Sequence, residues 1–244
     1  MDLGLTGRRV LVTGATDGLG KAIAEGYIDE GAVVFGAGRN QQKAMPEGCK
    51  GSSYVDLSTD GAPERLVESA AASMGGIDTV IAAAGGAVSG TIESASDDDW
   101  EMALQTNLMA VMRLCRAAAD PLKVRSGRIV IFGAVSAAEP RADHVVSNVC
   151  KAGVTVLAKT LSRELAGYDI LTNCIAPGRI RSGQLDRAFP DEQARRAFAA
   201  DRIPLGRFGD AKEVVPLTLL LGSALNTYVT GQTIAVDGGM SMSY

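Results

Sequence analysis

A glycine-rich segment near the start of the chain has the residue types and spacing of a phosphate-binding turn. Residues Thr13–Gly20 read T-G-A-T-D-G-L-G and follow directly after the apolar run Val10–Val12. Glycines permit a sharp turn and a close approach of the backbone to a pyrophosphate, and a following helix offers unpaired N–H groups and the positive end of its dipole. The spacing is G-x-x-x-G-x-G rather than G-x-G-x-x-G. Its place behind a predicted strand indicates the first unit of a dinucleotide-binding fold; an ordinary strand-to-helix turn is the alternative.

The elements that must position this turn alternate along the chain. Short apolar strands are predicted at Arg9–Thr13, Ala32–Ala37, Ser52–Val55, Asp78–Ala83, Arg128–Phe132, Leu171–Ile175 and Thr233–Val236. Helical patterns lie between them, near residues 19–30, 62–74, 98–119, 144–167 and 211–222. This alternation favours a doubly wound parallel α/β sheet of about seven strands, with helices on both faces.

One polar segment departs from the alternation, and its place suggests a role in substrate binding. Residues 180–209 carry six arginines and scattered apolar side chains. We expect a substrate loop here, although a solvated helical insertion is the alternative interpretation. Because no Pro- or Ser-rich linker divides residues 1–244, we expect a single domain.

Composition excludes several classes of function. A formal net charge of -4 argues against nucleic acid or an anionic membrane surface as the main partner. The four cysteines show no C-x-x-C spacing and there is one histidine, so we expect free thiols and no metal site. With no apolar run near 18 residues and no signal-like start, we expect a cytoplasmic protein that acts on a small molecule.

Four further motifs occur in order, and together with the glycine-rich turn they resemble the short-chain dehydrogenase/reductase family over about residues 5–242. They are V-D-L-S at 55–58, the helix asparagine Asn107, N-C-I-A-P-G at 173–178, and the closing V-T-G-Q-T-I-A-V-D-G-G at 229–239. In that family Asp56 would contact the adenine end of a dinucleotide, Asn107 would anchor a water in the active site, and the P-G motif would wrap the nicotinamide.

The resemblance implies a nicotinamide coenzyme and a homo-oligomer, either a tetramer or a dimer. The implied coenzyme-binding residues are Gly14, Thr16, Asp17, Gly18, Leu19, Gly20, Arg39, Asp56, Leu57, Ala84, Gly85, Lys151, Pro177, Gly178, Ile180 and Ser182. The family's reaction is hydride transfer between the nicotinamide and an alcohol or carbonyl. Its proton is handled by a tyrosine whose pKa a lysine four residues later lowers, and a serine about thirteen residues before the tyrosine binds the substrate oxygen.

The chain departs from this pattern at the catalytic positions. Lys151 is present, but Ser147 stands where the family has its tyrosine and Ala134 where it has its serine. Residues 82–86 read A-A-A-G-G where N-N-A-G-G is usual. The catalytic residues implied by the resemblance are therefore Asn107, Ser147 and Lys151.

Ser147 is a poor substitute for a phenol, because an alkanol has a far higher pKa and a neighbouring lysine shifts a pKa by only a few units. General acid–base catalysis contributes about 10²–10⁴ in rate, so its loss predicts slow rather than absent turnover. Other proton donors are His144 one helical turn earlier, Ser136, Lys151, or a water held by Asn107. The competing interpretations are a non-redox enzyme on this scaffold, a nucleotide-binding regulatory or partner subunit without turnover, and the product of a decaying gene.

The end of the second predicted strand bears on the choice of coenzyme. Gly38 occupies the position of an acid that would bind a ribose 2′-hydroxyl, and the next residue, Arg39, is suited to a 2′-phosphate. We therefore favour NADP(H) over NAD(H), although Asp17 in the glycine-rich turn weakens this preference.

Overall fold

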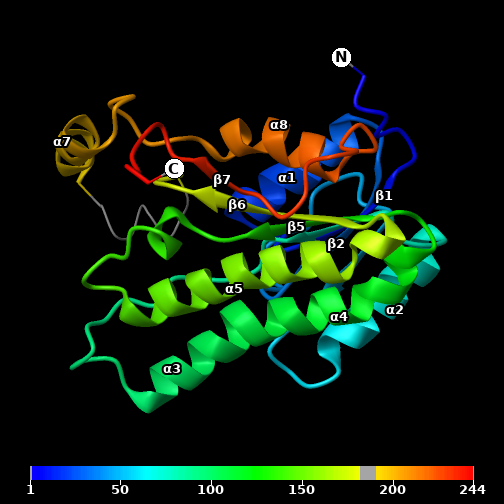
Figure 1. The fold of residues 1–244 in the computed structure, drawn as a ribbon, viewed down its shortest axis with the longest axis horizontal. Helices are drawn as coiled ribbons and strands as arrows, with labels where there is room; N and C mark the ends of the chain where they lie inside the picture. The colour runs from blue at the N-terminus through cyan, green and yellow to red at the C-terminus, as the bar shows by residue number, and fades with distance from the viewer. Residues whose placement is uncertain (1, 182–190, 244) are drawn as a thin grey trace.

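The computed structural model describes residues 2–181 and 191–243. Over these residues the strands form one seven-stranded sheet in the order β3-β2-β1-β4-β5-β6-β7, and every pairing is parallel (Figure 1). The predicted doubly wound sheet is confirmed. The strands are β1 (Arg9–Thr13), β2 (Val33–Gly38), β3 (Gly51–Tyr54), β4 (Thr79–Ala82), β5 (Arg128–Phe132), β6 (Leu171–Pro177) and β7 (Thr233–Val236).

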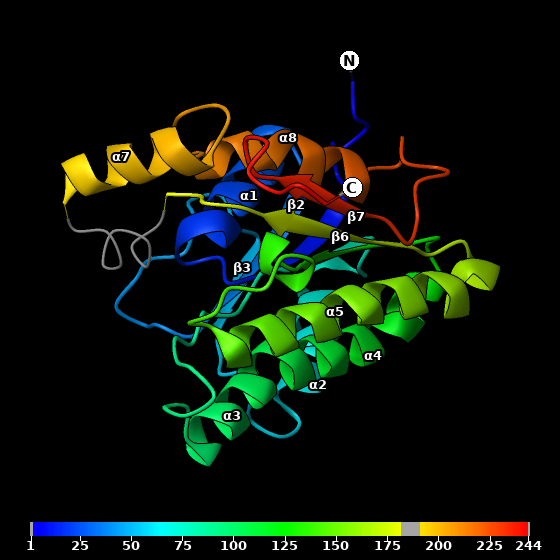
Figure 2. The same cartoon turned by 60° about the vertical axis from the view of Figure 1, so that its left-hand side comes forward.

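Helices cover both faces of the sheet (Figure 2). One layer contains α1 (Gly18–Asp29) and α8 (Ala211–Gly222), which pack on each other. The other contains α2 (Ala62–Met74), α4 (Ala110–Lys123) and α5 (Val145–Glu164). A separate apolar core lies on each side, and strands β1, β4 and β5 are buried on both faces.

The predicted helix over residues 98–119 is interrupted. It consists of α3 (Asp97–Leu104), the π-helical turn η1 (Gln105–Met109) and α4. A π-turn inserts one residue into the helical repeat and is frequent at functional sites. It carries Asn107, whose side chain is buried.

Capping boxes fix the starts of two helices. Ser96 and Asp99 form a capping box before α3, and Asp210 and Glu213 form one before α8. Each box satisfies backbone N–H groups that the first helical turn leaves unpaired.

Within the polar segment 180–209, the structure describes residues 180–181 and 191–209. The segment contains α7 (Glu192–Arg202), whose buried side packs with Ile203 and Phe208. The four cysteines are free, and no group of metal-ligating side chains occurs among the residues described. Within the same residues, none of the helices combines the length and the apolar character needed to cross a membrane.

Candidate active site

The glycine-rich turn connects β1 to α1 at the carboxyl edge of the sheet. Gly14 has φ +73°, and a Cβ on it would lie 3.0 Å from the carbonyl oxygen of Ala83. A Cβ on Gly20 would lie 2.3 Å from the carbonyl oxygen of Gly14, so side chains are excluded at both positions. The turn therefore packs closely on α1 and on the end of β4, and leaves backbone N–H groups at the helix start for an anionic ligand.

Asp17 is the N-cap of α1, and its carboxylate accepts a hydrogen bond of 2.9 Å from the N–H of Gly18. The same carboxylate pairs with the ammonium group of Lys43. Lys43 was not predicted from the sequence, because it lies in an irregular segment after β2 and no motif marks it. Its charge offsets the negative charge that had weakened the preference for a phosphorylated coenzyme.

The ends of β2 and β3 bring Arg39 and Asp56 together, 3.7 Å apart. Asp56 also accepts hydrogen bonds from the hydroxyl (2.6 Å) and N–H (2.9 Å) of Ser58. These bonds, and then the Arg39 charge, hold the pKa of Asp56 below its usual value. The side chain of Leu57 is buried in the core, which leaves only its backbone for a ligand.

Asn107, Gly85 and Lys151 meet beyond the ends of β4 and β5. The Asn107 carbonyl oxygen accepts from the N–H of Gly86 at 2.9 Å, and its amide donates to the carbonyl of Ala103 at 3.1 Å. A Cβ on Gly85 would lie 2.9 Å from the Asn107 oxygen and 3.8 Å from Lys151 Nζ. The structure therefore brings together two of the three predicted catalytic residues.

Lys151 projects from α5, and its Nζ donates to the carbonyl of Phe132 at 3.0 Å. Burial lowers the pKa of Lys151, while Cys174 and Cys150 act in the opposite direction. A buried ammonium with a lowered pKa is a stronger acid than an exposed one.

The hydroxyl of Ser147 forms hydrogen bonds with the main chain. Its Oγ donates to the carbonyl of Val88 at 2.9 Å and accepts from the N–H of Val88 at 2.6 Å. The side chain is buried, and the hydroxyl has a single proton to donate. Ser147 therefore fastens the segment after β4 to the start of α5.

The other candidate proton donors lie beside this contact. His144 Nδ1 is 2.8 Å from the carboxylate of Asp143, and Nε2 is 3.4 Å from Ser89 Oγ. The His144 contact is the main cause that lowers the pKa of Asp143. Ser136 lies in the short 3-10 helix η2 (Val135–Ala137), which begins directly after Ala134.

The P-G motif stands at the end of β6, where Pro177 is the last residue of the strand and Gly178 follows it. The N–H of Gly178 bonds to the carbonyl of Val236 at 3.0 Å, and a Cβ on Gly178 would lie 2.5 Å from the Cβ of Asp237. Ile180 forms an isolated parallel bridge with Gly209. The predicted coenzyme contact Ser182 lies outside the described residues.

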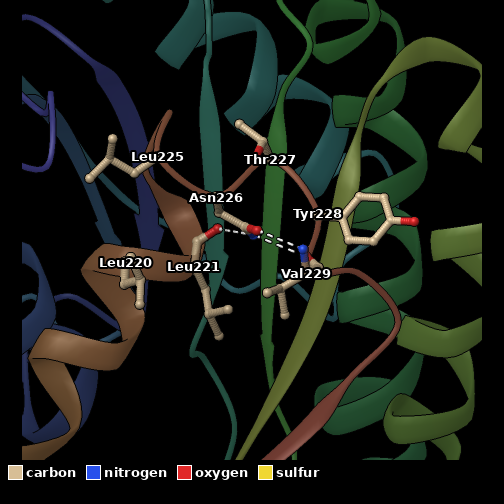
Figure 3. Close-up of a pocket in the computed structure, with 7 residues that line it drawn as sticks. All are labelled: Leu220, Leu221, Leu225, Asn226, Thr227, Tyr228 and Val229. Carbon is tan, nitrogen blue, oxygen red and sulfur yellow. Dashed lines mark hydrogen bonds between the residues drawn. The ribbon is translucent and has the colours of Figure 1, made fainter.

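A hollow at the opposite edge of the sheet has no comparable chemistry (Figure 3). It is lined by the end of α8 and by residues 225–229. The amide of Asn226 there bonds to the carbonyls of Leu221 and Val229, and its oxygen accepts from the N–H of Val229. Its polar side chain thus serves the loop itself.

The parallel sheet covered on both faces defines a Rossmann-type α/β protein. A family model described as Enoyl-(Acyl carrier protein) reductase matches residues 14–241, and the chain belongs to this family of short-chain dehydrogenase/reductase oxidoreductases.

Relatives match over nearly the whole chain. The 3-oxoacyl-[acyl-carrier-protein] reductase FabG of Salmonella typhimurium is 35% identical, with 97% of this chain and 98% of the relative covered. Nodulation protein G of Rhizobium sp. (strain N33) is 36% identical, with 98% of each covered.

Solved structures show the same fold. L-sorbose reductase from Gluconobacter frateurii, complexed with NADPH and L-sorbose, superposes with a TM-score of 0.92 at 28% identity and complete coverage of both chains. A 3-oxoacyl (acyl-carrier-protein) reductase from Agrobacterium tumefaciens C58 with NADP bound gives 0.90 at 28% identity, with 98% of this chain and 96% of that chain covered.

Proposed function

We propose that this protein is an NADP(H)-linked oxidoreductase of a carbonyl or alcohol substrate, in which Lys151 rather than residue 147 handles the proton. The proposal is supported by the different surroundings of two side chains on α5. Lys151 Nζ lies near Gly85 and Asn107, whereas the hydroxyl of Ser147 is bonded to the backbone of Val88.

The residues at the carboxyl edge fit a dinucleotide. The Gly14–Gly20 turn and the start of α1 would hold the pyrophosphate, Asp56 and the backbone of Leu57 the adenine end, and Gly85 with the P-G motif the nicotinamide. The binding surface would be completed by Thr16, Gly18, Leu19, Ala84, Pro177 and Ile180.

Preference for the 2′-phosphate is supported by the charges at the end of β2. Arg39 is exposed there, and Lys43 lies on the carboxylate of Asp17. An acidic side chain at position 38 would require Thr16 to move, because a Cβ on Gly38 would lie 2.5 Å from the Thr16 methyl carbon. The NADPH and NADP complexes of the similar structures agree with this preference.

When bound, the nicotinamide supplies or accepts the hydride. In the reducing direction the substrate oxygen then needs one proton. We assign the donation of this proton to Lys151 Nζ. The lowered pKa of Lys151 favours proton release, and the bond to the Phe132 carbonyl fixes the ammonium group. Asn107 orders the backbone at Gly86, and through it the floor of the site.

The test is a panel of ketones, aldehydes and alcohols with NADPH, NADH and the oxidised coenzymes. We expect turnover of at least one carbonyl with NADPH, abolished by Lys151→Ala. Lys159→Ala is the matched control, because Lys159 lies on the same helix and also donates to a backbone carbonyl, that of Gly231, at 3.0 Å. Coenzyme binding without turnover across the panel would instead support a nucleotide-binding partner subunit.

We also propose a homo-oligomer, either a dimer or a tetramer, in a cytoplasmic setting that keeps the thiols reduced. An apolar face on η1, α4 and α5 supports the assembly; Val149 and Val156 there are 47% and 65% exposed. We expect Val156→Glu to shift the mass measured by light scattering toward the monomer.

A further inference from the structure

A serine, a histidine and a carboxylate contact one another in this order in space, and the mechanism above does not use them. Ser89 Oγ lies 3.4 Å from His144 Nε2, and His144 Nδ1 lies 2.8 Å from a carboxylate oxygen of Asp143. A hydroxyl beside a base, with the base held by a third group, is the arrangement of nucleophilic catalysis. The distance between nucleophile and base commonly exceeds about 3.2 Å when no substrate is bound.

The backbone brings the serine and the histidine into register. Gly90 and His144 form an isolated parallel bridge between the segment after β4 and the start of α5. The N–H of Gly90 donates to the carbonyl of Asp143 at 2.8 Å, and the N–H of Val145 donates to the carbonyl of Gly90 at 3.2 Å. Ser89 directly precedes this bridge, so its distance from His144 is fixed by main-chain hydrogen bonds.

The residue before Ser89 is fixed as well. Val88 bonds to the Ser147 hydroxyl through both its N–H and its carbonyl. Ser89 is thus flanked on each side by an anchored residue, yet it is itself exposed. Its hydroxyl is therefore positioned and also open to a substrate.

His144 is oriented to accept a proton from Ser89. Its side chain is only 12% exposed, and Nδ1 is shielded from solvent. Among the residues described, Nδ1 makes no aligned hydrogen bond, and the Asp143 carboxylate is the anion beside it. This negative charge favours the neutral tautomer with its proton on Nδ1, which leaves the lone pair of Nε2 facing Ser89.

The backbone N–H of Ser89 can serve a developing oxyanion. Within residues 2–181 and 191–243 this N–H has no hydrogen-bond partner, whereas the N–H groups of Val88 and Gly90 are both used. In hydrolases with such a serine, the N–H of the nucleophile is one of the donors to the oxyanion. A single donor predicts slow turnover.

We propose that Ser89 and His144 are the catalytic residues of a second site, which hydrolyses carboxylic esters, and that Asp143 is their positioning residue. Ser89 Oγ attacks the carbonyl carbon of the ester, and its proton passes to His144 Nε2. The bond to the alcohol oxygen breaks as the alcohol takes this proton. Water then cleaves the acyl-serine, which restores the hydroxyl and releases the carboxylic acid. No step uses a coenzyme, so the proposal is independent of the oxidoreductase function.

Two probes test this site on the full chain without coenzyme. Release of p-nitrophenolate from p-nitrophenyl acetate gives kcat and KM, and a fluorophosphonate reports covalent modification of an activated serine. Peptide mass spectrometry then locates the acetyl and phosphonyl groups. We expect both groups on Ser89.

Variants assign the reactivity to the three side chains. Ser89→Ala should remove the label and the ester hydrolysis, and His144→Gln should slow both by about a hundredfold or more. Asp143→Asn should lower kcat with little change in KM, and Asp143→Glu should restore part of the loss. Ser94→Ala is the matched control, because this serine lies in the same segment and its Oγ accepts from the N–H of Thr91 at 2.9 Å.

The proposal is overturned if Ser89 is labelled no faster than Ser94, or if His144→Gln leaves the labelling rate unchanged. If His144→Gln does not fold by circular dichroism, Ser89→Ala and Asp143→Asn decide the question, and hydrolysis that persists in Ser89→Ala overturns the proposal. Failure to bind NADPH would count against the oxidoreductase function alone, because neither probe needs a coenzyme.

Discussion

The hydroxyl of Ser147 and the backbone of Val88 form a reciprocal pair, in which Oγ donates to the Val88 carbonyl and accepts from its N–H. The segment after β4 is therefore fastened to α5 at the position where the family resemblance implies a tyrosine. We interpret Ser147 as a residue that positions this segment.

Replacing Ser147 by Ala should destabilise the fold without removing the proton donor. Two backbone groups of Val88 lose their hydrogen-bond partner in a partly buried contact, which costs about 1 kcal/mol for each bond and corresponds to a fall of a few degrees in Tm. Ser162→Ala should cost less, because its hydroxyl bonds to the Lys159 carbonyl within its own helix and joins no second segment among the residues described. A changed pH profile of kcat in Ser147→Ala would show that the hydroxyl takes part in proton transfer.

Restoring the family residues should not simply restore the family's activity. In Ala134→Ser with Ser147→Tyr, a phenol must replace a hydroxyl that lies in contact with Val88, so residues 86–90 must move. We expect the double variant to be less stable than the parent, by thermal unfolding, and to gain little turnover on generic ketones. A large gain with unchanged Tm would mean that the segment yields easily and that the natural chain lacks only these two groups.

The buried ammonium of Lys151 should carry a stability penalty. Its pKa in the folded state is lowered below the ordinary value of 10.5. Between these two pKa values the unfolded chain therefore binds more protons than the folded one, and stability rises with pH. Below this pH range the ammonium is charged in both states, so the full free-energy cost of burying it applies. We expect Lys151→Met to raise Tm at pH 7, to lose this advantage as the pH approaches 10.5, and to weaken coenzyme binding. Lys159→Met is the control; an unchanged or lower Tm for Lys151→Met at pH 7 contradicts the expectation.

The pair Arg9–Asp78 should govern part of the acid sensitivity. Burial tends to raise the pKa of Asp78, but hydrogen bonds from the Arg9 side chain and N–H outweigh it and the pKa is lowered. The stabilisation is therefore complete above the unfolded value of 3.8 and is lost as the pH falls toward the folded pKa. Asp78→Asn should lower the free energy of unfolding at pH 7 by about 1–3 kcal/mol. It should also make this free energy depend less on pH in the acid range. Asp120→Asn, in a pair whose carboxylate is 89% exposed, should do neither.

The sheet and the glycine-rich turn were predictable because their signals are local. Apolar strands such as Arg128–Phe132 and the capping boxes at Ser96 and Asp210 specify their own structure from a few neighbouring residues. The break in the helix at Gln105–Met109 was missed, because the inserted residue leaves no mark in the hydrophobic periodicity.

The site was predictable only where a motif marked it. Motifs marked Lys151, Asn107 and Gly85, which the structure places near one another. No motif marks Lys43 or the Val88 backbone, because their contacts depend on the fold.

The most direct test of the account is a fluorescence titration of the protein with NADPH and NADH, repeated with Gly20→Ala and Gly167→Ala. A Cβ at position 20 meets the Gly14 carbonyl, whereas one at position 167 meets nothing within 4 Å. The account predicts saturable binding with NADPH preferred, lost in Gly20→Ala and kept in Gly167→Ala, with both variants folded by circular dichroism. Absence of binding at millimolar coenzyme, or unchanged binding by Gly20→Ala, would contradict it.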